Sequence, residues 1–312
     1  MYELNISTFG QHTRYSFHHP TSNNGFSLVP AAGANLLDLF FNGNHLLDGY
    51  QTPEELDAGK WGKSALLCPF PNRLDAGKYT WMGKSYQFPL NSEATGNAIH
   101  GFVRGQVFEP TYIFLSAHMA RIGCVYHYPG DLAYYPFPFS MEVIFAIHNS
   151  GKFELHVSIQ NLHDTAIPMG FGWHPYFKLA AHADVHQMKL PASEKIIVNE
   201  RMIPTGQREK MADFQKLTPI NKQALDTCFA YKNSQGRYRI ILKNEGKTLQ
   251  INAQAATFPF FQVFTPPHRE SIALEPMSCN VDAFNNQADG CSLAPGETWK
   301  GVVRMAYKNT SA

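Results

Sequence analysis

Residues 139–160 read FSMEVIFAIHNSGKFELHVSIQ and carry the clearest structural pattern of the chain. Apolar and polar side chains alternate on both sides of Asn149-Ser150-Gly151, a segment of turn-forming residues. The apolar positions are Met141, Val143, Phe145 and Ile147 before the turn, and Phe153, Leu155, Val157 and Ile159 after it. A period of two puts these side chains on one face of each strand. The stretch therefore predicts an antiparallel hairpin with one buried face.

Strand patterns continue along much of the chain. Residues 78–90 predict a second hairpin that turns at Met82-Gly83-Lys84-Ser85. Further apolar runs lie at 111–128, 185–198, 228–243, 247–254, 260–265 and 299–307. The helical pattern is short, with Thr52 as the cap of a single turn that ends near Asp57. We therefore expect an all-β fold, a large antiparallel β-sandwich with few short helices, formed as a single domain over residues 1–312.

Composition narrows the classes of function. Lysine and arginine total 26, against 25 aspartate and glutamate residues, so the net charge of +1 gives no electrostatic reason to expect nucleic acid or an anionic membrane as a partner. Neither a signal sequence nor a run of about eighteen apolar residues is present. Five scattered cysteines without a CxxC pair are typical of free thiols: Cys68, Cys124, Cys228, Cys279 and Cys291. These features predict a cytoplasmic protein with a small-molecule partner.

His174 and Glu275 each stand directly before a proline, in Trp173-His174-Pro175 and Leu274-Glu275-Pro276. The residue before proline favours extended backbone, so both should lie in strands or at strand ends. Alternation then puts His174 and Tyr176 on one side of their strand, with Trp173 and Phe177 on the other. A histidine and a carboxylate held on stiff strands are suited to general acid and base catalysis. We expect this pair to be the catalytic centre.

Ordered motifs extend the hypothesis beyond this pair. Asn72-Arg73 is followed by Asp75-Ala76-Gly77-Lys78-Tyr79, Ile99-His100-Gly101, the segment Gly172 to Phe177, Leu225-Asp226 and Leu274-Glu275-Pro276. In this order and at these separations, over residues 60 to 285, the set resembles the aldose 1-epimerase (galactose mutarotase) family. The resemblance implies the galactose mutarotase-like sandwich, no cofactor, and interconversion of the α and β anomers of a sugar.

The resemblance also implies a role for each matching residue. Glu275 matches the general base, and His174 the general acid. The sugar-binding positions are His100, Arg73, Asp226, Asn72 and Arg104. Anomer exchange needs a proton acceptor at the anomeric hydroxyl and a proton donor at the ring oxygen, and no metal ion. Histidine suits the donor role because its ordinary pKa of about 6.5 lets it exchange protons near neutrality.

Alternatives to this function remain open. His100-Gly101-Phe102-Val103-Arg104 also resembles the hexose-6-phosphate epimerase branch, which uses arginines for the phosphate. A carbohydrate-binding protein without turnover is another reading, because a fold does not fix a function. Glycoside hydrolysis is a third, but it normally needs two carboxylates, and only Glu275 matches a motif.

Other motif candidates are weaker. His182 and His186 have the i, i+4 spacing of metal ligands but lie in a loop-like segment without a third ligand nearby. The four tryptophans are most simply core or edge aromatics: Trp61, Trp81, Trp173 and Trp299. The sugar, its phosphorylation and the oligomeric state are not determined by the sequence.

Overall fold

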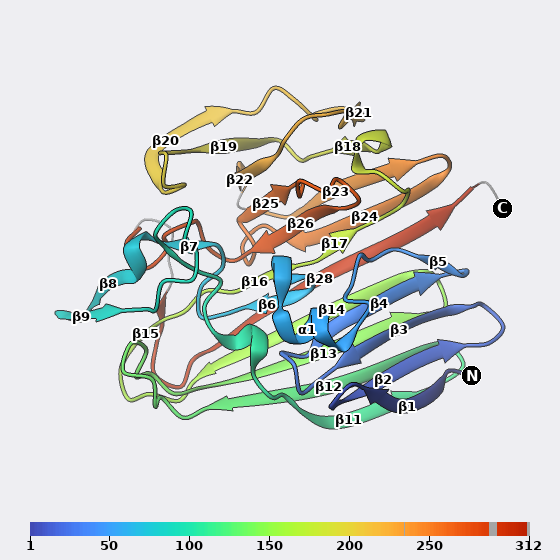
Figure 1. Cartoon of the computed structure of the whole chain (residues 1–312), viewed down its shortest axis with the longest axis horizontal. Coiled ribbons are helices and arrows are strands. Elements are labelled where there is room, and N and C mark those ends of the chain that lie inside the picture. Colours follow the sequence, from blue (N-terminus) through green and yellow to red (C-terminus); the bar gives the residue numbers. More distant parts are fainter. Residues whose placement is uncertain (234, 287–291, 311–312) are drawn as a thin grey trace.

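The computed structural model describes residues 1–233, 235–286 and 292–310. Within these residues the chain forms three large antiparallel sheets (Figure 1). The nine-stranded sheet contains, in spatial order, β11 (Glu109–Leu115), β12 (Met119–Tyr128), β13 (Phe139–His148), β14 (Lys152–Asn161), β28 (Thr298–Asn309), β24 (Lys247–Gln254), β23 (Arg237–Asn244), β18 (Gln187–Lys189) and β21 (Thr218–Pro219).

Two other sheets complete the main framework. The eight-stranded sheet contains β20 (Pro204–Lys210), β19 (Ser193–Val198), β22 (Asp226–Tyr231), β25 (Phe260–Phe264), β26 (Ile272–Met277), β16 (Gly172–His174) and β6 (Ala65–Leu67), with β17 (Tyr176–Phe177) also paired to β26. The five-stranded sheet contains β1 (Glu3–Phe9), β2 (His12–His19), β3 (Asn24–Val29), β4 (Asn35–Phe41) and β5 (Asn44–His45).

Short elements connect these sheets. Three two-stranded pairs are β7 (Arg73–Leu74) with β10 (Ala98–Ile99), β8 (Lys78–Trp81) with β9 (Lys84–Gln87), and β15 (Ile167–Pro168) with β27 (Ser292–Leu293). The helices are α1 (Pro53–Ala58) and the 3-10 turns η1 (Lys60–Gly62), η2 (Asp75–Gly77), η3 (Val103–Gly105) and η4 (Ala183–Val185). The predicted all-β fold with few short helices is confirmed. The longest helix in the described part of the chain is α1, and no helix there could span a membrane.

Both predicted hairpins are present. Strands β13 and β14 pair in a continuous antiparallel register in which Val143 faces Val157, and the apolar face predicted by alternation is buried. Strands β8 and β9 form the second hairpin. Helix α1 also begins as expected, because the Thr52 side chain accepts a hydrogen bond from the Glu55 backbone N–H at 3.3 Å.

The five-stranded sheet was not predicted from the sequence. Strands β3 and β4 are buried on nearly every residue, so their apolar side chains form runs rather than an alternating pattern. The five-stranded sheet and the eight-stranded sheet both pack against the nine-stranded sheet. Phe153 of β14 lies 5.8 Å between ring centroids from Phe26 of β3 and 6.4 Å from Trp173 of β16. One aromatic ring therefore contacts both sheets of the opposite layer.

The described cysteines agree with the prediction of free thiols. Cys68, Cys124, Cys228 and Cys279 are buried and unlinked, and burial raises the pKa of Cys124 to about 12. Cys291 lies outside the described residues.

Candidate active site

One face of the eight-stranded sheet presents polar side chains from strands that are distant in sequence. Register pairs Gln262 of β25 with Glu275 of β26, and Asp226 of β22 with Phe264 of β25. Paired residues share a face, and so do alternate residues along a strand. Asp226, Gln262, Phe264 and Glu275 therefore project to the same side of the sheet.

The strand that carries His174 joins the same face. His174 and Tyr176 border a pocket, whereas Trp173 and Phe177 are fully buried in the core on the opposite side. The alternation predicted from Trp173-His174-Pro175-Tyr176-Phe177 is thus confirmed. Core packing of Trp173 and Phe177 fixes the strand, and the strand fixes the direction of the imidazole.

Two loop segments form the opposite wall of the pocket. The His100 backbone N–H donates to the Asn72 carbonyl at 2.8 Å, and the Phe102 and Val103 N–H groups both donate to the Cys68 carbonyl, at 3.0 and 3.2 Å. These bonds tie residues 68–74 to residues 98–104, so Arg73 and His100 are held at a fixed separation.

Gly101 permits this close approach of the two segments. It has a φ of +60°, and a Cβ atom built on it would lie 2.1 Å from the Cys68 carbonyl oxygen. Gly101→Ala should therefore lower the free energy of unfolding by about 2–4 kcal/mol, through both left-handed strain and backbone displacement. Denaturant unfolding measures this loss.

Gly96→Ala is the matched control, because Gly96 has a similar φ of +64° but open space around its Cβ position. It should cost only about 1–2 kcal/mol from strain. Equal losses in the two variants would contradict the close-contact explanation for Gly101.

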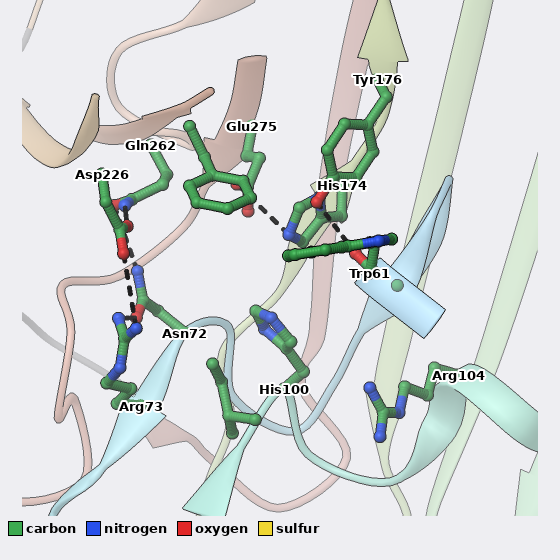
Figure 2. A pocket seen from close by; sticks show the side chains of 13 residues that line it. Trp61, Asn72, Arg73, His100, Arg104, His174, Tyr176, Asp226, Gln262 and Glu275 are labelled. Atoms are coloured by element: carbon green, nitrogen blue, oxygen red, sulfur yellow. Dashed lines mark hydrogen bonds and ion pairs between the residues drawn. The ribbon is translucent and has the colours of Figure 1, made fainter. Parts of the chain in front are cut away.

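The pocket between the sheet face and the loops has a volume of about 210 Å³. This is below the roughly 300–1,000 Å³ typical of sites for drug-sized ligands and suits a smaller molecule. All the residues proposed for the site from sequence line it (Figure 2): Asn72, Arg73, His100, Arg104, His174, Asp226 and Glu275. The structure thus brings these side chains together, and their individual roles stay predictions.

The sequence interpretation missed several lining residues: Trp61, Gly62, Ile99, Tyr176, Gln262 and Phe264. Tyr176 had a signal, since it alternates with His174. Gln262 and Phe264 lie in a run predicted as a strand, and only their register with β26 reveals that they face the pocket. Trp61, expected to be a core or edge aromatic, borders the pocket through η1.

Four side chains at one end of the pocket form a ring of three hydrogen bonds closed by an ion pair, which we call the polar ring (Figure 2). Arg73 Nη1 donates to Asn72 Oδ1 at 3.1 Å, and Asn72 Nδ2 donates to Gln262 Oε1 at 3.1 Å. Gln262 Nε2 donates to Asp226 Oδ1 at 2.5 Å, and Asp226 Oδ2 lies 3.5 Å from Arg73 Nη2. Arg73 and Asp226 are therefore fixed before any ligand enters.

His174 and Glu275 lie side by side at the floor of the pocket (Figure 2). His174 Nε2 is 3.4 Å from Glu275 Oε1, and the two side chains are only 7% and 2% exposed. Glu275 Oε2 is buried and has no hydrogen-bond partner among the described residues. A buried carboxylate with an unpaired oxygen is costly unless a ligand hydroxyl supplies the missing donor. The pair is therefore suited to accept and return protons of a hydroxylated ligand.

Burial changes the proton affinity of both groups. It raises the pKa of Glu275 well above its ordinary value; the nearby Asp226 raises it further, and Arg73 opposes this. Burial lowers the pKa of His174 to about 3, and the positive charge of Arg104 contributes to this decrease. Together these shifts favour a pair that holds one proton across a wide pH range.

Aromatic contacts orient the His174 ring. The Tyr176 ring stacks on the His174 ring at a centroid distance of 4.9 Å, and the His100 ring meets it edge-on at 5.2 Å. The Tyr176 hydroxyl donates to the Trp61 carbonyl at 3.0 Å. Burial and the nearby His174 lower the pKa of His100 well below its ordinary value, so this second imidazole is neutral at pH 7.

Arg104 is the most isolated of the predicted site residues. Its side chain, on η3, lies on the far side of His100 from Arg73 (Figure 2). It makes no hydrogen bond or ion pair with other described residues, and it is partly exposed. Its guanidinium is thus available to a ligand at the end of the pocket opposite the polar ring.

The weaker metal-site candidate has a structural explanation. His186 is buried, with Nε2 accepting from the Leu179 N–H at 3.1 Å and Nδ1 3.0 Å from the Ala183 carbonyl. Both ring nitrogens are therefore engaged by the backbone. In the described ranges, no group of three or more His, Cys, Asp or Glu side chains is arranged to hold a metal ion.

Comparisons with known proteins agree on one family. The family model described as aldose 1-epimerase matches residues 20–306. The chain is 27% identical over 280 residues to the uncharacterized protein YihR of Escherichia coli strain K12, covering 86% of both chains. It is 28% identical over 149 residues to the galactose mutarotase of Rattus norvegicus, covering 46% of this chain and 41% of that protein.

Solved structures share the fold. A galactose mutarotase-like protein from Clostridium acetobutylicum superposes with a TM-score of 0.86 at 16% identity, covering 99% of both chains. A galactose 1-epimerase from Lactobacillus acidophilus superposes with a TM-score of 0.84, also at 16% identity and 99% coverage of both chains. The expected galactose mutarotase-like sandwich is thereby confirmed.

Proposed function

The chain belongs to the aldose 1-epimerase family, and from this premise we propose that it interconverts the α and β anomers of a hexose. The observation that carries the proposal is the contact of His174 Nε2 with Glu275 Oε1 at 3.4 Å on the floor of a sugar-sized pocket. Both groups reach the same bound ring from adjacent strands, as acid and base catalysis of one bond cleavage requires.

The proposed reaction conserves protons. Glu275 accepts the proton of the C1 hydroxyl while the C1–O5 bond breaks, and His174 donates a proton to the departing ring oxygen. The product is the open-chain aldehyde. Rotation about C1–C2 presents the other face of the carbonyl to O5. When the ring closes, Glu275 returns its proton to O1, and the hydroxyl on C5 returns its proton to His174. No co-reactant is consumed.

The environment of the pair supports these roles. Before reaction the two groups share one proton, either as a neutral pair or as carboxylate and imidazolium. Burial favours the neutral pair, whereas their contact and the sugar hydroxyls favour the ion pair. A raised Glu275 pKa makes its carboxylate a stronger proton acceptor, and a lowered His174 pKa makes its imidazolium a stronger proton donor. Both shifts thus favour transfer to and from weakly acidic sugar oxygens.

The remaining predicted residues bind the sugar in this proposal. Arg73 presents a planar fork of donors to adjacent hydroxyls, and Asp226 accepts from hydroxyls through oxygens already positioned by Gln262. Asn72 holds the Arg73 guanidinium in place. His100, neutral and in edge contact with His174, can donate or accept a single hydrogen bond.

Anomer relaxation tests the proposal. A solution of pure α-glucose or α-galactose is followed by proton NMR with and without the protein. We expect relaxation to the α/β equilibrium to accelerate in proportion to protein concentration. Spontaneous rates for every hexose tried would contradict the proposal and favour a binding protein without turnover.

The pH dependence of kcat/KM should show where the pair titrates. Since the pKa of His174 is lowered to about 3, the pair gains a second, inhibitory proton only near that pH. The acid limb should therefore lie well below about 6.5, the ordinary value of histidine. Initial anomerisation rates between about pH 2.5 and 8, corrected for unfolded protein, measure it. An acid limb near the ordinary histidine value would contradict the assignment.

A hexose 6-phosphate is the second candidate substrate. The observation that favours it is the uncommitted guanidinium of Arg104 at the edge of the pocket, since arginine binds phosphate oxygens in a bidentate manner. Exchange between the anomers of glucose 6-phosphate, measured at equilibrium by NMR, distinguishes it from a free hexose.

We also propose a cytoplasmic location and a single domain over residues 1–312. Four buried cysteines without a disulfide in the described ranges support the first. One buried cluster that includes both Tyr2 and Tyr307 supports the second.

A further inference from the structure

A second cavity adjoins the proposed active site. Its volume is about 240 Å³, close to the 210 Å³ of the first pocket. It lies between the five-stranded sheet, helix α1 and η3, and it shares Gly62 and Arg104 with the first pocket. A Cβ atom on Gly62 would lie 3.9 Å from His174 Cδ2. Gly62, which has no side chain, thus lies beside His174 on the boundary that the two cavities share.

The proposed reaction sets the direction of the sugar relative to this passage. Glu275 acts at the hydroxyl on C1, and His174 acts at the ring oxygen. The direction from Glu275 to His174 therefore follows the ring from C1 to O5, and the next atom is C5, which carries C6. Arg73 lies on the opposite side of the pocket from Arg104 (Figure 2). The C6 group consequently points away from Arg73 and towards Gly62 and the second cavity.

The size and charge of the second cavity indicate what it accepts. It is as large as the first pocket, which already suits one pyranose. Its walls include the small side chains of Ala31, Ala32, Ala58 and Ala65. Its cation Arg104 is accompanied by the carboxylate of Asp57, which lies 2.6 Å from His12 Nε2. A phosphate dianion would face this carboxylate and leave much of the volume unfilled, whereas a neutral glycosyl group would fill it.

Hydrogen-bonding capacity supports the same class of ligand. Asn35 borders the cavity and is 4% exposed; its Nδ2 donates to the Lys63 carbonyl at 2.7 Å. Its Oδ1 has no partner among the described residues. This oxygen is itself buried, so it is not presented to a ligand in the cavity. The hydrogen-bonding group that the cavity does present is the Arg104 guanidinium, whose donors sugar hydroxyl oxygens can accept.

We propose that the second cavity is a subsite for a glycosyl unit attached to C6, and that the preferred substrate is a reducing disaccharide with a 1→6 linkage. This inference rests on the proposed anomerisation. The reducing hexose occupies the first pocket, the linkage passes Gly62, and Arg104 binds hydroxyls of both units. A 1→4-linked disaccharide projects its second unit from another carbon and does not reach the cavity.

The test compares kcat/KM for anomer exchange of glucose, isomaltose and maltose, which share a reducing glucose and differ in the presence or linkage of the second unit. We expect isomaltose to exceed maltose by about tenfold or more. Ala58 is exposed and, of the two cavities, borders only the second. Ala58→Phe should lower the ratio of kcat/KM for isomaltose to kcat/KM for glucose by about tenfold. Ala31→Leu narrows the cavity from the other wall and should lower the same ratio.

Glu54→Phe is the matched control, an exposed residue on the same helix that borders neither cavity. It should leave the ratio unchanged. Turnover of glucose with equal use of isomaltose and maltose, or with no change of ratio in either filling variant, would overturn the subsite while leaving the mutarotase function intact. A preference for glucose 6-phosphate that Ala58→Phe abolishes would also overturn it, in favour of an anion site. No turnover of any sugar would instead overturn the proposed function.

Discussion

Glu275→Gln is expected to lower kcat for anomer exchange by about a hundredfold to ten-thousandfold. The amide keeps the size of the side chain but cannot accept the proton of the C1 hydroxyl. Because Glu275 is 2% exposed and its carboxylate lies against His174, bulk solvent has little access to the position of the missing carboxylate. Anomer relaxation of glucose by NMR measures the loss, and a parallel binding titration should show that the sugar still binds.

The same variant has a signature in stability. Burial raises the folded-state pKa of Glu275, so the folded protein retains a proton that the unfolded chain releases above about 4.3. Stability from this group is therefore present at low pH and is lost as pH rises through the folded pKa. In thermal unfolding, the Tm of Glu275→Gln should therefore change less with pH than the Tm of wild type between pH 5 and pH 8.

For activity, a kcat of Glu275→Gln within about threefold of wild type would remove Glu275 from the mechanism.

His174→Gln should produce a loss of similar size, about a hundredfold to ten-thousandfold in kcat. Glutamine places an amide group near the position of Nε2 but cannot donate a transferable proton to the ring oxygen. The acid limb of the pH profile should disappear with the imidazole, which a purely structural defect would not cause. Initial rates across the pH range measure both effects.

The double variant tests whether the two residues act as one unit. If they do, Glu275→Gln combined with His174→Gln should be only slightly slower than either single variant, because each single change already removes the coupled transfer. Multiplication of the two losses would indicate independent contributions and argue against a shared catalytic step.

The strongest sequence signals came from local periodicity. Alternation predicted the β13–β14 hairpin and the placement of His174 and Trp173 on opposite faces of their strand. Burial of one face of a strand requires an apolar side chain at every second position, and this pattern is visible in the sequence. The five-stranded sheet gave no comparable signal. Its β3 and β4 are buried on both faces, and such strands lose the alternation on which the prediction depends.

The residues of the candidate site also fall into those that local sequence motifs could predict and those that depend on tertiary register. Residues in compact motifs, such as Asn72-Arg73 and Glu275 before proline, could be proposed from the sequence and its family resemblance. Gln262 could not, since its part in the polar ring depends on a register between two strands. Nor could the second cavity, whose walls come from residues as distant in sequence as Ala31 and Arg104. Contacts set by tertiary register leave no mark in a short window of sequence.

The polar ring has a consequence for the thermodynamics of the proposed sugar binding. Asn72, Arg73, Asp226 and Gln262 already hold one another through three hydrogen bonds and an ion pair. A mobile polar side chain loses about 0.5–1.5 kcal/mol of conformational entropy when a ligand fixes it. In this protein that cost is borne during folding, so it does not recur in each catalytic cycle. Sugar release is correspondingly not accompanied by relaxation of these side chains, and the site is ready for the next molecule without reorganisation.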